Sequence, residues 1–188
     1  MNFTRRTLAA ASVALAALMP LTLSSAVHAA SRAEKVESAE SALHRLEASE
    51  PRARFFARHA KAVLVFPSIL KAGFIFGGET GNGVLLEHGK PAGYYILSGG
   101  SWGLQIGGQD FSYALFFMTD SSLNYLKKTD GFDVGTGPSI VVINAGAGAE
   151  ANVTTITHDV YAFPFNQKGL MADLTLQGTK ITRVHPHH

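Results

Sequence analysis

The chain has 188 residues, no cysteine, and a formal net charge of +2 from 16 Lys and Arg against 14 Asp and Glu. Arg5 and Arg6 lie in a leader that we predict to be removed, so 16 − 2 = 14 basic residues balance the 14 acidic ones, all of which follow residue 33. This balance argues against a globally basic nucleic-acid binder. The absence of cysteine excludes disulfides, thiolate metal sites, a cysteine nucleophile and a lipoprotein thiol.

The N-terminus has the order of a secretory signal peptide. Arg5 and Arg6 form a positive start, Leu8 to Leu23 is apolar, and Val27-His28-Ala29 resembles a cleavage site. Pro20 interrupts the apolar run, which disfavours a membrane anchor. We therefore predict a signal peptide over 1–29, exported by the Sec or the Tat route, and a single domain over 30–188. The mature protein is then periplasmic, peripherally associated with the outer membrane, or secreted.

Two helices are predicted next, and together they form a helical part over 31–61. Ser31 to Ser49 carries an apolar stripe at spacings of 3, 4 and 3 (Val36, Ala39, Leu43, Leu46). Pro51 then begins a second helix, to about Lys61, with Ser49 or Glu50 as its cap.

The second helix is rich in basic and aromatic residues. Arg54, Arg58 and Lys61 fall on one helical face, and no acid occurs from Pro51 through Gly78. One interpretation is a surface for lipid headgroups, with Phe55 or Phe56 entering the acyl boundary. The other is an ordinary solvated face with both phenylalanines in the core, and the residues alone favour it. The basic and aromatic residues of this helix are Arg52, Arg54, Phe55, Phe56, Arg58 and Lys61.

From residue 62 the pattern changes to short apolar or alternating runs separated by Gly, Asn, Pro or Ser, typical of strands. A short helix interrupts them from Thr119 to Lys128, capped by Thr119 or Asp120. Gly78 to Gly83 and Gly99 to Gly103 are predicted to be turns. The predicted fold is α+β and β-rich: a strongly curved, barrel-like antiparallel sheet over 62–185, covered by the N-terminal helices. The predicted strands are Val63–Phe66, Gly73–Glu79, Gly83–Glu87, Gly93–Leu97, Trp102–Ile106, Phe111–Phe117, Ser139–Asn144, Val153–Thr157, Val160–Phe165, Leu170–Leu176 and Lys180–Val184.

Signals for catalysis or metal binding are weak. Gly99-Gly-Ser-Trp-Gly103 matches the G-x-S-x-G nucleophile elbow, but a strand rather than a helix is predicted to follow, so a hydrolase using Ser101 is a minor alternative. The histidines lack ligand spacing, and His185-Pro-His-His188 is a terminal tract that is more often adventitious. We expect no enzyme activity, no cofactor and no metal site.

Three blocks together resemble the SYLF domain family. They are Val65-Phe-Pro-Ser68 with Lys71-Ala-Gly73, then Ser101-Trp-Gly-Leu-Gln-Ile-Gly107, and finally Lys168-Gly-Leu-Met-Ala172 with Leu176-Gln-Gly-Thr-Lys-Ile181. Tyr94 to Ser98 departs from a Trp-Ser-Pro-like motif of eukaryotic members, so the chain looks like the bacterial, secreted branch.

The resemblance implies phospholipid binding with a contribution from an amphipathic N-terminal region. It therefore favours the headgroup interpretation of the second helix and adds four basic residues from the matching blocks: Lys71, Lys168, Lys180 and Arg183. Some family members are linked to actin, which an exported chain would not ordinarily meet. We expect a non-enzymatic binder of anionic phospholipid membranes in the cell envelope, with a protein–protein interaction module as the alternative. No nucleic-acid partner is expected.

Overall fold

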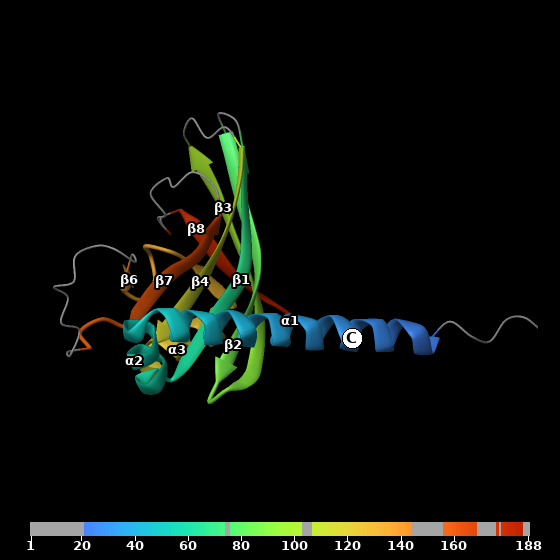
Figure 1. Cartoon of the computed structure of the whole chain (residues 1–188), viewed down its shortest axis with the longest axis horizontal. Coiled ribbons are helices and arrows are strands. Elements are labelled where there is room, and N and C mark those ends of the chain that lie inside the picture. Colours follow the sequence, from blue (N-terminus) through green and yellow to red (C-terminus); the bar gives the residue numbers. More distant parts are fainter. Residues whose placement is uncertain are drawn as a thin grey trace, which may run out of the picture.

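The computed structural model describes residues 21–73, 76–102, 107–143, 156–168, 176 and 178–185. Two N-terminal helices precede an eight-stranded sheet whose order is β5-β8-β3-β2-β1-β4-β7-β6. The long strands β1 to β4 form a tall curved ribbon, and α1 runs across it and extends beyond it (Figure 1). The elements are α1 (Leu21–Ser49), α2 (Pro51–His59), β1 (Ala62–Gly73), β2 (Phe76–Glu87), β3 (Lys90–Trp102), β4 (Gly107–Phe117), α3 (Asp120–Lys128), β5 (Gly131–Asp133), β6 (Ile140–Val142), β7 (Val160–Lys168) and β8 (Thr179–Val184).

The predicted fold class is confirmed: the protein is α+β and strand-rich, and its sheet curves into a half-barrel with the helices at its N-terminus. The sheet is mixed rather than purely antiparallel, because β6 pairs with β7 in parallel. The other strand pairs are antiparallel.

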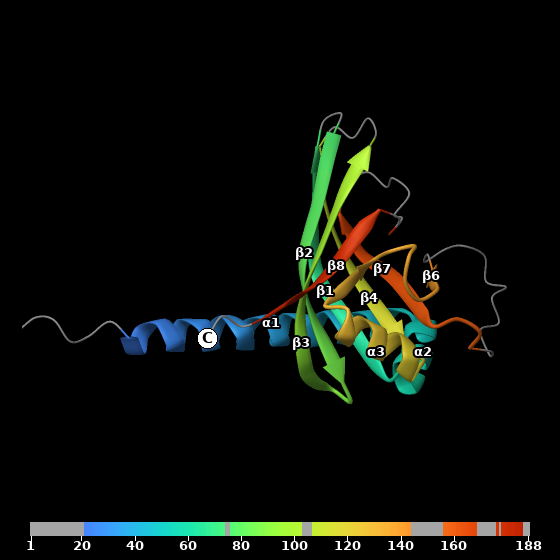
Figure 2. The same ribbon diagram turned by 180° about the vertical axis from the view of Figure 1, so that it is seen from behind.

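Both faces of the sheet carry apolar side chains, and helices cover part of each face. In β1, Leu64 and Phe66 point to one side while Val63 and Val65 point to the other, as the two-residue period of a strand requires. Helices α1 and α2 cover the side of Val63 and Val65, which we call the α1 face. Helix α3 packs on the opposite side, the α3 face, and the two sides are visible in Figures 1 and 2.

Pro67 interrupts the pairing of β1 without ending the strand. The register with β4 shifts between Phe66 and Ile69, and both of these side chains are buried on the α3 face. The Ser112 hydroxyl donates a hydrogen bond to the Pro67 carbonyl at 2.7 Å. A proline in a central strand is tolerated at such a bulge. The strand predicted to end at Phe66 therefore continues to Gly73 as β1.

The glycine-rich segments predicted as turns are strands, and this prediction was wrong. Gly78 to Gly83 lies within β2, and Gly99 to Trp102 lies within β3. A Cβ at Gly81 would lie 2.6 Å from Ile69 Cγ1, and one at Gly83 would lie 2.5 Å from Phe66 Cε1. These glycines serve close packing on the α3 face. The turn itself is at His88 and Gly89, whose φ angles of 51° and 74° suit a two-residue hairpin.

The predicted helices are confirmed, and their bounds differ from the prediction at the start of α1 and at the end of α2, which ends at His59 rather than near Lys61. Glu50 caps α2, and its side chain accepts from the Arg52 backbone N–H, while Thr119 caps α3 by accepting from Ser122. Helix α1 begins at Leu21, ten residues before the predicted start. The predicted strands Val153–Thr157 and Leu170–Leu176 lie largely outside the described residues. Of the helices in the described part of the chain, none is both long and apolar enough to cross a bilayer.

Phe56 fastens the N-terminal helices to the sheet. Its side chain is fully buried, stacks on Tyr161 with ring centroids 4.2 Å apart, and also contacts Phe163 and Phe116. Ala53, one helical turn earlier, is buried beside it in the same cluster. The orientation of α2 therefore follows from the burial of one aromatic side chain among three others.

A buried ion pair lies on the α3 face, between β1 and β2. Lys71 and Glu79 are direct cross-strand partners, are 7% and 8% exposed, and approach to 4.0 Å between Nζ and Oε2. Burial raises the pKa of the Glu79 carboxyl, and the charge of Lys71 opposes that rise. Removing the carboxylate from water therefore disfavours its charged form more than the attraction of Lys71 favours it.

Replacing Phe56 by alanine should cost about 3–5 kcal/mol of unfolding free energy, the usual range for a fully buried phenylalanine. The matched control is Phe55→Ala, because Phe55 is only half-buried and should cost much less. Urea denaturation of both variants measures the difference. Equal losses would contradict the role given to Phe56.

The buried Lys71–Glu79 pair predicts that the folding stability depends on pH. Because the pKa of Glu79 is raised on folding, the folded chain keeps a proton that the unfolded chain releases near pH 4.5. The contribution of Glu79 to the free energy of unfolding is fully present below that pH, and it is lost as the pH rises through the pKa of Glu79 in the folded protein. Glu79→Gln should therefore gain stability relative to the original chain across this window, by about 1.4 kcal/mol per unit of raised pKa. Urea denaturation from pH 4 to 8 tests this, and a relative loss would mean that pairing with Lys71 dominates.

Candidate functional site

The predicted basic helix is present as α2, and its basic side chains differ in the hydrogen bonds and ion pairs that they form. Arg52 is bound to Glu50 through two hydrogen bonds, Nε to Oε1 at 2.9 Å and Nη2 to Oε2 at 3.0 Å. The side-chain hydrogen bond to Arg52 lowers the pKa of Glu50 and raises that of the guanidinium. Arg52 is thereby largely neutralised by its neighbour at the start of α2.

Arg54 and Arg58 are both exposed, but only Arg54 has a structural contact. Its guanidinium donates to the Glu47 carbonyl at 2.8 and 3.1 Å, which ties α2 to the last turn of α1. Within the described part of the chain, Arg58 forms no hydrogen bond or ion pair. Lys61 pairs with Asp120 at 3.4 Å, with side chains 48% and 75% exposed. An ion pair so exposed is weak and yields readily to another anion.

The two phenylalanines of α2 have different roles. The interpretation that Phe56 enters a lipid layer is wrong. Its side chain is fully buried and is surrounded by the aromatic side chains of the core. Phe55 is half-buried; its ring lies edge-on to Phe56 with centroids 5.5 Å apart, and contacts the His59 ring in a tilted arrangement with centroids 4.4 Å apart. It is the aromatic side chain of α2 that retains accessible surface beside the cations.

The four basic residues taken from the family blocks are not gathered around α2. Lys71 is buried in its pair with Glu79, so it offers no surface to a membrane. Lys180 and Arg183 lie in β8, which two strands separate from β1. Lys180 is exposed, whereas Arg183 is half-buried and donates to the Lys127 carbonyl at 3.4 Å. Lys168 ends β7, and its side chain lies outside the described residues.

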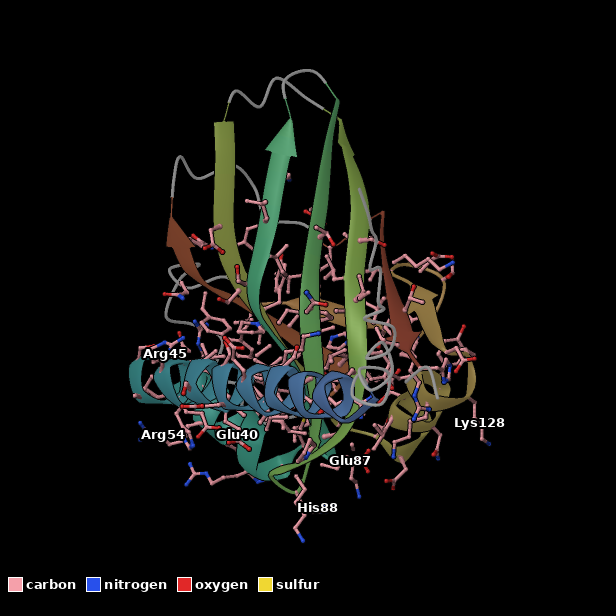
Figure 3. The ribbon with its side chains drawn as sticks, turned by 90° about the vertical axis from the view of Figure 1, so that its right-hand side faces the viewer. Glu40, Arg45, Arg54, Glu87, His88 and Lys128 are labelled. Carbon is pink, nitrogen blue, oxygen red and sulfur yellow. The ribbon has the colours of Figure 1, made fainter. Side chains whose placement is uncertain are left out.

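A groove of about 510 Å³ opens between α1, α2, the start of β1 and the β2–β3 turn. Helix α1 contributes Glu40 and Glu47 to it, while Arg58 and Lys61 line the side of α2. In Figure 3, Glu40 and Arg54 project on the same side of α1, toward the hairpin tip that carries His88, and Arg45 lies on the opposite side. The volume falls within the range of small-molecule sites.

Sequence reasoning missed the α1 side of this groove. Glu40, Leu43, His44 and Glu47 follow the spacing of one helical face, and they all line the groove. That spacing was visible, but it gives no information on where α2 turns back or where the β2–β3 hairpin ends. His88 and Gly89 came from a segment predicted only as a gap between strands.

The geometry around Ser101 differs from that of a nucleophile elbow. Ser101 lies in β3 and pairs with Gly77 of β2, and β4 begins at Gly107. The elbow requires a sharp turn that leads from a strand into a helix. Among the residues that the structure describes, no three His, Asp or Glu side chains converge as metal ligands.

Comparison with known proteins gives one family. Residues 98–185, from within β3 to the end of β8, match the family described as "Ysc84: Las17-binding protein actin regulator". No curated protein matches the chain. The description is that of a binding protein, and the matched region is the one that holds the second and third of the SYLF-like blocks. Residues 98–185 therefore match the Ysc84, or SYLF, domain family, in agreement with the resemblance of the sequence blocks.

Proposed function

We propose that this protein is a non-enzymatic phospholipid-binding protein of the cell envelope, which docks on anionic headgroups through α2. The observation that carries the proposal is the exposure of Arg54, Arg58 and Lys61 on one short helix and its end, beside the half-buried Phe55. The next acid along the chain after Glu50 is Glu79, and it is buried on the far face of the sheet. The family's character as a binding domain supports a binding role.

The expected interaction is weak and reversible. Each basic side chain near an anionic membrane contributes about 1 kcal/mol, and Phe55 adds limited apolar contact. Lys61 must exchange Asp120 for a lipid phosphate, which is feasible because both side chains are largely exposed. Three such contacts would suit a peripheral protein, and salt should weaken them.

The predicted signal peptide places this activity outside the cytoplasm as part of the proposal. Removal of residues 1–29 would shorten α1 but keep the part that packs on the sheet, namely Ala39, Ala42 and Leu46. The docking surface and the groove are therefore compatible with the mature chain.

The leader hypothesis has a direct test. Protein recovered from the periplasm or the medium should begin at Ala30, because cleavage is predicted after Val27-His28-Ala29. Intact-mass spectrometry measures the start. An exported chain that still begins at Met1 would contradict cleavage.

The docking hypothesis predicts a charge-dependent association with vesicles. The protein should sediment with vesicles containing phosphatidylglycerol and not with pure phosphatidylcholine, and 0.5 M salt should reduce sedimentation because the contacts are exposed. Arg54→Glu/Arg58→Glu/Lys61→Glu should lower the affinity at least tenfold, since three attractive contacts become repulsive.

The matched control is Arg32→Glu/Arg45→Glu/Lys128→Glu, which changes the net charge equally at exposed positions away from α2. It should retain most of the binding, and circular dichroism should show both variants folded. If both triple variants lost the same affinity for the vesicles, the effect would come from net charge and not from α2. Association that needs no lipid and survives salt would favour a protein partner instead.

A further inference from the structure

We propose that the groove between α1 and α2 binds a phospholipid headgroup that carries both a phosphate and a primary ammonium, as in an ethanolamine phospholipid. This inference rests on the proposed function and names the headgroup that enters the groove. It starts from the fact that the two walls of the groove carry opposite charges.

The α1 wall is acidic. Glu40 and Glu47 lie seven residues apart on one face of α1, are half-exposed, and line the groove. Within the described residues neither carboxylate takes part in an ion pair. A pair of carboxylates in this position repels a purely anionic headgroup and attracts an ammonium.

The α2 wall is basic. Arg58 lines the groove with no partner among the described residues, and Lys61 lies beside it with only the exposed contact to Asp120. Neither cation reaches Glu40 or Glu47 within 4.0 Å, although all four side chains line the same groove. Opposite charges thus face a common space without neutralising each other.

The floor of the groove is apolar. Leu43, Val63 and Leu86 line it between the charged walls. Such a floor suits the glycerol and first methylenes of a lipid and weakens the competition of water for the charged groups. The volume of about 510 Å³ exceeds what a single phosphate needs.

A ligand with two opposite charges satisfies both walls at once. Phosphate can accept hydrogen bonds from the Arg58 guanidinium, and a primary ammonium can donate three to the glutamates. Choline carries the same charge but has no N–H to donate, and glycerol carries no positive charge. The groove should therefore distinguish ethanolamine from both headgroups.

The test compares vesicles of equal anionic charge. Binding is measured for 70:30 phosphatidylethanolamine:phosphatidylglycerol and for 70:30 phosphatidylcholine:phosphatidylglycerol. The original chain should bind the ethanolamine vesicles about fivefold more tightly, as expected from one additional partly exposed ion pair. Glu40→Gln/Glu47→Gln should abolish that preference and bind the choline vesicles as well as the original chain or better, because two repulsive charges are gone.

The control variant is Glu34→Gln/Glu37→Gln, which removes two exposed carboxylates of α1 that do not line the groove. It should keep the ethanolamine preference. A preference that is absent in the original chain, or that persists in Glu40→Gln/Glu47→Gln, would overturn the proposal while leaving anionic docking intact.

A second arm uses the soluble headgroup glycerophosphoethanolamine and detects binding from NMR shifts of groove amides such as those of Ala57 and Gly89. Shifts in the original chain that disappear in Glu40→Gln/Glu47→Gln would support headgroup binding in the groove. If such shifts were seen while the protein did not bind vesicles, only the proposal of membrane docking would be rejected. The absence of shifts at millimolar headgroup would also reject the groove as a headgroup site.

Discussion

The structure depends on one constraint: strand β1 lies in the middle of the sheet and has apolar side chains on both faces. Val63 and Val65 need cover on one side, and Leu64 and Phe66 need it on the other. A curved sheet can enclose the second set with its own strands and α3. The first set lies on the outer side, where cover must come from another element, and α1 and α2 supply it. Burial of apolar surface at roughly 25 cal/mol per Å² is the driving term for both layers.

This constraint sets the geometry of the candidate site. With Phe56 and Ala53 facing the sheet, the helical period turns Arg54 and Arg58 outward. The same docking brings the last turn of α1 against α2, where Arg54 binds the Glu47 carbonyl. The groove is then the space left between two helices that meet the sheet at separate places. Its charges are a consequence of amphipathic helices whose polar edges face each other.

The sequence allowed the helices and their caps to be predicted, because Pro51, Glu50 and Thr119 act through local chemistry. It misled where glycine was taken as a sign of turns: Gly81 and Gly83 are required by Phe66 and Ile69 on another strand, a contact that no local pattern reveals. The cations of α2 were predictable in the same local sense. The groove was not, since it joins residues from Glu40 to Gly89 through tertiary packing. Lys71 shows the converse, because a lysine in a matching block is buried against Glu79.

The family match and the candidate site occupy different parts of the chain, and the structure explains how they are connected. The matched residues 98–185 include β4 and β7, which supply Phe116, Tyr161 and Phe163. These three rings form the platform on which Phe56 rests. The platform fixes the position of α2 through one buried side chain and leaves its outward residues unconstrained by packing. Arg58 and Glu40 can therefore be substituted without disturbing the core, whereas Arg54 also ties α2 to the last turn of α1.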